Sequence, residues 1–243
     1  MKNLYLISPQ DNWADRKGDR PPLGLLYLSS YLKQFKHQVR IFDLNHDIIS
    51  IKDVFKDKPD FVCISVPTPN YKGAIDIANR FLSLRYNERT KRIFSHKLKL
   101  VAGGAHVAGY PDEPLTLKVF DHIVAGHGDG EQALLDIIEG RTKEQIVKAG
   151  FIEDLDSLPL PDYEALDMPK YNMMLEGMKA ITMSTSRGCV YCFDEETEIL
   201  TDEGWKLLKN LNKTEKVATV NKENKSFEWQ YPTDYIKSFY RGK

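Results

Sequence analysis

Residues 98–106 read LKLVAGGAH, a short apolar run that ends in two glycines and a histidine. An apolar run that passes into a glycine-bearing loop is typical of a buried parallel strand at the point where the chain leaves the sheet. Four further apolar runs occur in the first 140 residues, at residues 4–8, 39–43, 61–66 and 122–125. We therefore predict five strands of one parallel sheet.

Segments with apolar residues at helical spacing lie between these runs. They cover residues 21–35, 73–84 and 131–139, and Pro21 and Pro22 suit the first turn of the first helix. Repeated strand–helix–strand units favour an α/β fold with a doubly wound parallel sheet of the flavodoxin-like, or Rossmann-type, class. We assign this domain to residues 1–150.

Ligands of such sheets bind at the carboxyl ends of the strands, where the loops leave the sheet. Glycines at these ends allow a backbone to approach a ligand closely, but they also make tight turns without any ligand, so both interpretations stay open. The candidate cofactor-binding residues at the strand ends are Ser65, Thr68, Gly103, Gly104, His106, Gly126 and Gly128.

The composition is that of an ordinary globular protein. Of the 243 residues, 42% are hydrophobic and 28% are charged, which excludes a disordered or collagen-like chain. A net charge of −1 favours neither nucleic acid nor an anionic membrane as a partner, and no apolar run approaches the roughly 20 residues of a membrane span. With three cysteines and no secretory signal in the sequence, we expect a reducing, cytoplasmic location.

The chain changes character after residue 150. Residues 151–180 are rich in prolines and acids and predict an extended linker, which is followed by a short strand at residues 180–184. From Cys192 onward, short apolar stretches alternate with turns such as Asp202-Glu203-Gly204, which predicts a small all-β fragment. The expected boundaries are residues 1–150, 151–191 and 192–243.

Several phrases between residues 21 and 191 resemble one family. PPLGLLYLSSYL, DFVCISVPT, VAGGAHVAG and DLDSLPLPDYEALD, in this order, are similar to radical S-adenosylmethionine enzymes with an N-terminal cobalamin-binding domain. The resemblance implies cobalamin as the cofactor of the predicted crevice, and the Gly-Gly-x-His loop of that family supports His106. His127 departs from the family's usual Glu. The first histidine is His37, so the histidine–cobalt bond that many cobalamin proteins make from the first loop is absent.

STSRGCVY, residues 184–191, resembles the start of that family's CxxxCxxC cluster motif. In the family, three thiolates hold a four-iron four-sulfur cluster whose open iron chelates S-adenosylmethionine. Cys189 matches the first ligand, but Cys192 follows at CxxC spacing and no cysteine comes after it. This chain is therefore expected to lack a complete cluster site.

CFDEETEILTDEGWKLLKNL, residues 192–211, resembles the opening of an intein, a self-splicing insertion with a Hint-type β fold. Cys192, Thr197, Ile199 and Gly204 match the family's positions. The resemblance implies that Cys192 is the splicing nucleophile, and that a complementing C-terminal intein and enzyme fragment is a partner. An insertion after Tyr191 would explain both the broken cluster spacing and the change to β structure, and the cluster and S-adenosylmethionine would then belong only to the complete, spliced enzyme.

Other interpretations of the cysteine pair stay open. Cys189 and Cys192 alone could form a redox pair or half of a zinc site, although no further zinc ligands lie nearby in the sequence. A different class of function is a non-catalytic ligand-binding module with an inert C-terminal tail.

Overall fold

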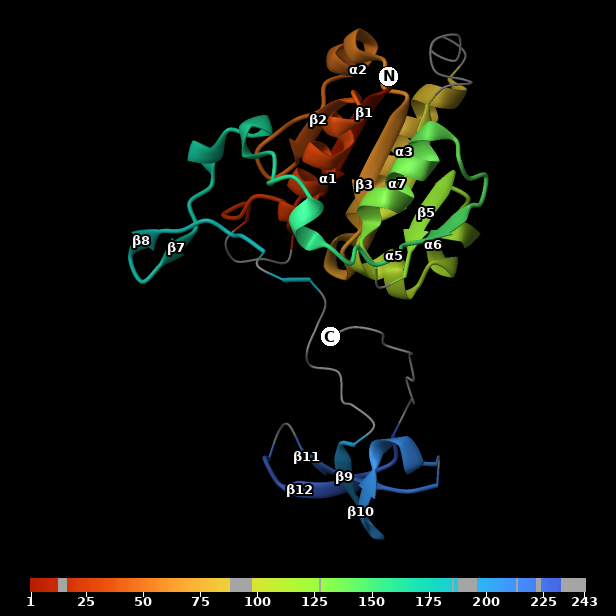
Figure 1. Ribbon diagram of the computed structural model, residues 1–243, viewed down its shortest axis with the longest axis vertical. Coiled ribbons are helices and arrows are strands. Elements are labelled where there is room, and N and C mark those ends of the chain that lie inside the picture. The colour runs from red at the N-terminus through yellow and green to blue at the C-terminus, as the bar shows by residue number, and fades with distance from the viewer. Residues whose placement is uncertain are drawn as a thin grey trace. The chain divides into compact units, whose positions relative to one another are not determined.

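The computed structural model describes residues 1–12, 17–87, 98–126, 128–184, 186–187, 196–212, 214–221 and 224–232. The chain forms two compact units, Met1–Gly188 and Cys189–Lys243, which are described separately (Figure 1). None of the helices in the described residues has the length and apolar composition needed to cross a membrane.

The first unit is built on a six-stranded parallel sheet, which bears out the predicted α/β class. Its strands are β1 (Asn3–Ser8), β2 (Gln38–Asp43), β3 (Phe61–Ser65), β4 (Lys99–Gly103), β5 (His122–Ala125) and β6 (Ile146–Lys148), in the order β2-β1-β3-β4-β5-β6. The first five follow the 2-1-3-4-5 order of flavodoxin-like sheets. The sequence predicts five strands, and the sixth is an edge strand of three residues, too short to show an apolar pattern.

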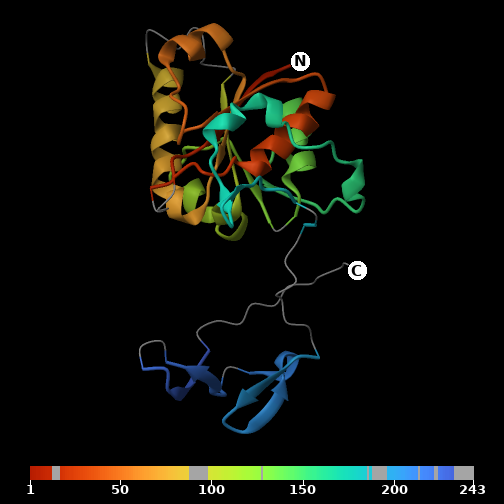
Figure 2. The ribbon, with the colours of Figure 1, turned by 90° about the vertical axis from the view of Figure 1, so that its left-hand side faces the viewer.

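Helices cover both faces of this sheet. One face carries α1 (Leu23–Gln34) and α7 (Gly130–Glu139), and the other carries α2 (Ile51–Asp57), α3 (Tyr71–Tyr86) and α5 (Ala105–Gly109), which is followed by α6 (Asp112–Thr116). In Figure 2, α3 and α1 lie on opposite sides of the sheet. Fully buried leucines such as Leu26 and Leu135 each stabilise this arrangement by about 1.5–3 kcal/mol. The sheet is therefore doubly wound.

The linker packs along the first unit without a long regular element. It contains three short 3₁₀ turns, η2 (Leu155–Ser157), η3 (Tyr163–Ala165) and η4 (Met168–Lys170), and the hairpin of β7 (Met174–Leu175) and β8 (Met178–Lys179). Asp162 accepts hydrogen bonds from Ser29 and Lys33 of α1, each at 2.5 Å. The Tyr171 hydroxyl donates to Asp43 at the end of β2, at 3.1 Å. Side chains thus attach the linker to both α1 and the sheet.

The strand expected at residues 180–184 is wrong, because these residues join no sheet. Tyrosine hydroxyls, rather than the backbone of a neighbouring strand, lie close to two of the carbonyl groups of this segment. Tyr163 donates to the Thr182 carbonyl at 2.8 Å, and Tyr27 of α1 lies 3.5 Å from the Ser184 carbonyl. The segment is therefore attached to Tyr163 of η3 and to Tyr27 of α1 rather than to a neighbouring strand.

The second unit is all-β, as the sequence predicts. Its antiparallel sheet has the order β10-β9-β11-β12, with β9 (Glu198–Thr201), β10 (Gly204–Leu207), β11 (Val217–Val220) and β12 (Phe227–Gln230), and a 3₁₀ turn, η5 (Leu208–Asn210), follows β10. The turn between β9 and β10 needs Gly204, whose φ is +109°.

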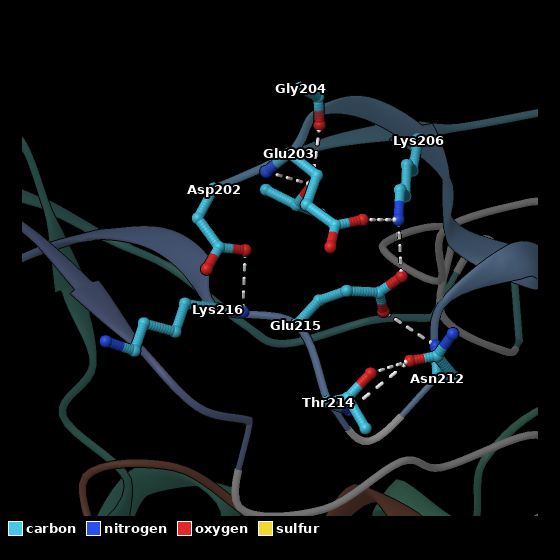
Figure 3. A network of polar contacts seen from close by, with 9 residues as sticks. Asp202, Glu203, Gly204, Lys206, Asn212, Thr214, Glu215 and Lys216 are labelled. Carbon is cyan, nitrogen blue, oxygen red and sulfur yellow. Dashed lines mark hydrogen bonds and ion pairs between the residues drawn. The ribbon is translucent and has the colours of Figure 1, made fainter.

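A buried carboxylate organises one end of this sheet (Figure 3). Glu215 is 3% exposed, and its two oxygens accept hydrogen bonds from the Lys206 ammonium and the Asn212 backbone amide, both at 2.7 Å. Lys206 also reaches Glu203 at 2.6 Å. The bond from Lys206 lowers the pKa of the Glu215 carboxyl, so this group stays charged and holds the turn before β11 against β10.

Candidate functional site

A cavity of about 690 Å³ opens at the carboxyl ends of the strands in the first unit. Its floor comes from the ends of β1, β3, β4 and β5, and its sides come from the beginnings of α1 and α7 and from Ser184 and Arg187. This is the position at which doubly wound sheets bind ligands, and the volume is in the range of small-molecule sites.

Five of the seven candidate residues line this cavity. They are Ser65, Gly103, Gly104, Gly126 and Gly128. Ser65 and Gly103 are paired in register at the ends of β3 and β4, which brings the loops after these two strands to the same place.

Thr68 and His106 are not among the lining residues and lie together in a separate cluster. The His106 Nδ1 atom is 3.4 Å from the Thr68 hydroxyl, and its Nε2 atom is 3.1 Å from Glu113. The ring is packed between Tyr71 and Tyr110, at centroid distances of 4.4 and 5.9 Å. The cause is helical geometry, because Ala105 and Ala108, about one turn apart in α5, line the cavity, whereas the buried His106 and Val107 between them face away from it.

The glycines of the cavity serve two different purposes. A Cβ atom on Gly104, whose φ is +105°, would lie 3.0 Å from the Val66 amide nitrogen, and one on Gly128 would lie 2.3 Å from the Gly150 carbonyl oxygen. These two glycines are required by close backbone packing. A Cβ atom on Gly103 would meet nothing closer than the Val124 Cβ at 4.0 Å. Gly103 therefore leaves its space open to the cavity, as a closely approaching ligand would require, whereas backbone packing explains Gly104 and Gly128.

We expect Gly128→Ala to destabilise the first unit by about 1–3 kcal/mol, because the added methyl group overlaps the Gly150 carbonyl, which cannot move without breaking its hydrogen bond from the Asp129 amide. The measurement is urea unfolding followed by helical circular dichroism, since the described α-helices all belong to this unit. The matched control is Gly24→Ala in α1, where no described atom lies within 4 Å of the new methyl group. That change should stabilise the helix by about 0.5–1 kcal/mol. Equal stability of Gly128→Ala and the wild type would contradict the packing argument.

An ion-pair cluster at the cavity was not predicted from the sequence. The Arg187 guanidinium lies 2.9 Å from Asp129 and 2.7 Å from Glu131, and over the Tyr27 ring at 4.8 Å. Burial works to lower the pKa of Arg187, but the bonds to Glu131 and Asp129 outweigh it and raise the pKa above its usual value. One residue in the sequence could have indicated this cluster. Glu131 is a charged residue within the otherwise apolar face of α7, where a buried charge needs a partner.

The remaining lining of the cavity combines apolar walls with a few polar groups. Leu23, Leu28 and Leu134 form walls, and the hydroxyls of Ser8 and Ser65 lie at the strand ends. No histidine lines the cavity in the part of the chain that the structure describes. His37, the first histidine, is buried beside Glu139 at the far end of α7, where burial lowers its pKa. This chemistry suits a ligand with both apolar and hydrogen-bonding surface.

Several candidate residues lie outside the described residues, namely His127, Cys189 and Cys192. The third cysteine, Cys63, lies in β3 and is buried, which raises the pKa of its thiol to about 12. It is therefore an unreactive core thiol. The described residues contain no group of three or more His, Cys, Asp and Glu side chains suited to a metal ion.

A curated protein from an archaeon is similar in sequence to this chain. The chain is 27% identical over 218 residues to PH0819 of Pyrococcus horikoshii, an uncharacterized methyltransferase. The match covers 79% of this chain and 44% of the relative. The chain thus spans less than half the length of that protein.

Solved structures agree on the fold. The cobalamin-dependent S-adenosylmethionine radical enzyme OxsB with aqua-cobalamin bound superposes with a TM-score of 0.60 at 20% identity, over 82% of this chain and 28% of that one. The same enzyme with S-adenosylmethionine also bound gives 0.59 at 19% identity, over 85% and 30% of the two chains.

The family comparison covers most of the residues that line the cavity. The B12 binding domain family matches residues 10–137, more than half of the chain, a span that includes the ends of β3, β4 and β5 and the beginning of α7. The sequence match and the architecture of the first unit agree, and the chain belongs to the B12 binding domain family.

Proposed function

We propose that the first unit binds cobalamin in the cavity at the strand ends, as the N-terminal part of a cobalamin-dependent radical S-adenosylmethionine enzyme that transfers methyl groups. The observation that supports the proposal is the cavity itself, because most of its lining residues lie within the span that matches the B12 binding domain family. The name of the Pyrococcus relative supports methyl transfer, and the fold of OxsB supports the class of enzyme.

The residues of the cavity fit this cofactor. Gly103 leaves open space where a bulky ligand can approach the sheet, and the hydroxyls of Ser8 and Ser65 can hydrogen-bond to its amide and phosphate groups. The leucines of α1 and α7 provide an apolar wall for its hydrocarbon surface. When bound, cobalamin supplies a cobalt centre able to carry a methyl group. The described lining residues offer no imidazole, so we expect them to make no histidine–cobalt bond.

Titration of the full chain with hydroxocobalamin tests this proposal. We expect one equivalent to co-elute with the protein in gel filtration, with a changed visible spectrum, because the cavity removes the cofactor from water. An unchanged spectrum with no retained cofactor would overturn the proposal, and it would favour a module for a different ligand.

We further propose that residues 192–243 are the N-terminal part of a Hint-type intein inserted in the cluster motif. The supporting observation is the division of the chain, because the second unit begins at Cys189 and its described residues form an all-β sheet. In this proposal Cys192 is the splicing nucleophile and Cys189 becomes the first cluster ligand after splicing. The four-iron four-sulfur cluster and S-adenosylmethionine then belong to the complete, spliced enzyme, and a C-terminal intein and enzyme fragment is the partner. The competing proposal is an inert tail.

A further inference from the structure

Arg187 connects its own segment of the chain to two helices, α1 and α7, that lie far from it in the sequence. Its guanidinium pairs with Asp129 and Glu131, at the N-terminus of α7, and stacks on Tyr27 of α1. We call these four residues the rim clamp. All four line the cavity, so the clamp forms part of its boundary.

The rim clamp is held by charges that are largely withdrawn from water. The Glu131 side chain is 5% exposed and that of Asp129 is 11% exposed. Among the described residues, Arg187 is the one cation within ion-pair distance of Glu131. Removing one member of a buried pair leaves the other charge uncompensated, so the clamp opens only at a cost. The helix dipole of α7 also favours the two carboxylates at their present place, at the N-terminus of the helix.

Neighbouring bonds also hold two of the other residues of the rim clamp. The Tyr27 hydroxyl lies 3.5 Å from the Ser184 carbonyl, and Asp129 also accepts a bond from the Ile152 amide at 2.8 Å. Ser184 lines the cavity together with Arg187. One side of the cavity is thus formed by Ser184 and Arg187, which lie 45 and 48 positions beyond the end of α7, and the bonds of Arg187 attach this side to α1 and α7.

We propose that Arg187 is a positioning residue of the cofactor cavity, which ties the Ser184 and Arg187 backbone to α1 and α7 and thereby slows release of the bound cofactor. This inference rests on the proposed binding of cobalamin. Arg187 does not act as a cobalt ligand or as an anion site, because two carboxylates already neutralise its charge.

The first test measures how fast the full chain loses hydroxocobalamin when it is chased with a large excess of cyanocobalamin. We expect Arg187→Gln to release the cofactor at least about tenfold faster than the wild type, since changes at a binding site act mainly on dissociation. Arg187→Lys keeps the charge but lacks the planar guanidinium that reaches both carboxylates while lying over the Tyr27 ring, so its rate should lie between those of the wild type and Arg187→Gln. The matched control is Arg141→Gln. Arg141 pairs with Asp136 and Glu139 at the other end of α7, half-exposed and away from the cavity, and its loss should leave the rate unchanged.

If Arg187→Gln does not fold, the variant Glu131→Gln tests the same ion pair from the other side. It is nearly isosteric, leaves Asp129 still paired with Arg187, and removes the negative charge from one of the two ion pairs that Arg187 makes. We expect a severalfold faster release with unchanged helical circular dichroism. If a folded Arg187→Gln or Glu131→Gln variant releases cobalamin as slowly as the wild type, the positioning role is wrong.

A second measurement needs no cofactor. Limited digestion with proteinase K, mapped by mass spectrometry, should cut between Glu176 and Arg187 faster in Arg187→Gln than in the wild type or Arg141→Gln, because the segment is released from α1 and α7. Equal cutting would show that the clamp does not hold the segment and would overturn the inference. If the wild type binds no cobalamin at all, the proposed function fails and the retention role with it, whereas this digestion still shows whether the clamp attaches the segment.

Discussion

Replacing Gly103 with valine is expected to abolish measurable cobalamin binding while leaving the first unit as stable as the wild type. Gly103 is the last residue of β4 and lines the cavity, and no described atom is closer than 4.0 Å to the place of a Cβ. The valine side chain suits a strand and meets no backbone, so the fold should tolerate it. It fills space that the cofactor needs, and we expect the dissociation constant for hydroxocobalamin to rise at least about 100-fold, or about 2.8 kcal/mol.

Gly109→Val is the matched control for this prediction. Gly109 ends α5 and has no described atom within 4 Å of a Cβ, but it does not line the cavity. Its affinity for hydroxocobalamin should equal that of the wild type. Spectroscopic titration gives the affinities, and urea unfolding shows that both variants are folded. Wild-type affinity in Gly103→Val would show that the cofactor does not approach the end of β4.

The second large effect is expected at Cys192. If the intein proposal holds, the Cys192 sulfur attacks the Tyr191 carbonyl carbon, a C–S bond forms, and the Cys192 nitrogen leaves with a proton. An amide is a poor electrophile, so this step needs a donor for the oxyanion, which in the family comes from a later part of the intein. We therefore expect the chain alone to be nearly inert. With a complementing C-terminal intein fragment, dithiothreitol or hydroxylamine should cleave between Tyr191 and Cys192, and Cys192→Ala should abolish that cleavage.

Cys63→Ala is the control for Cys192→Ala, since it removes a thiol that is buried in β3. It should leave cleavage unchanged. Mass spectrometry of the two products locates the cut. Cleavage that persists in Cys192→Ala, or that never occurs in the complemented wild type, would contradict the intein proposal and favour an inert tail.

The pattern of apolar residues along the chain was sufficient to predict the main strands and helices of the first unit. Five apolar runs predict β1 to β5, and helical spacing predicts α1, α3 and α7, because long elements bury enough side chains to leave a period in the sequence. The short elements α2, α5, α6 and β6 left no such pattern. Five lining residues could also be predicted from the sequence, because the carboxyl ends of parallel strands meet at one edge of the sheet. They are Ser65, Gly103, Gly104, Gly126 and Gly128.

The tertiary structure alone decided which side chains face the cavity. Thr68 and His106 lie next to the same loops as Ser65 and Gly103, but the turn of α5 directs His106 into a cluster with Glu113 and two tyrosines. Arg187 reaches Glu131 across 56 positions of chain, which no local pattern can show. Sequence periodicity reports burial along one element, whereas a contact between elements depends on their orientation, and orientation is set by the packing of the whole unit.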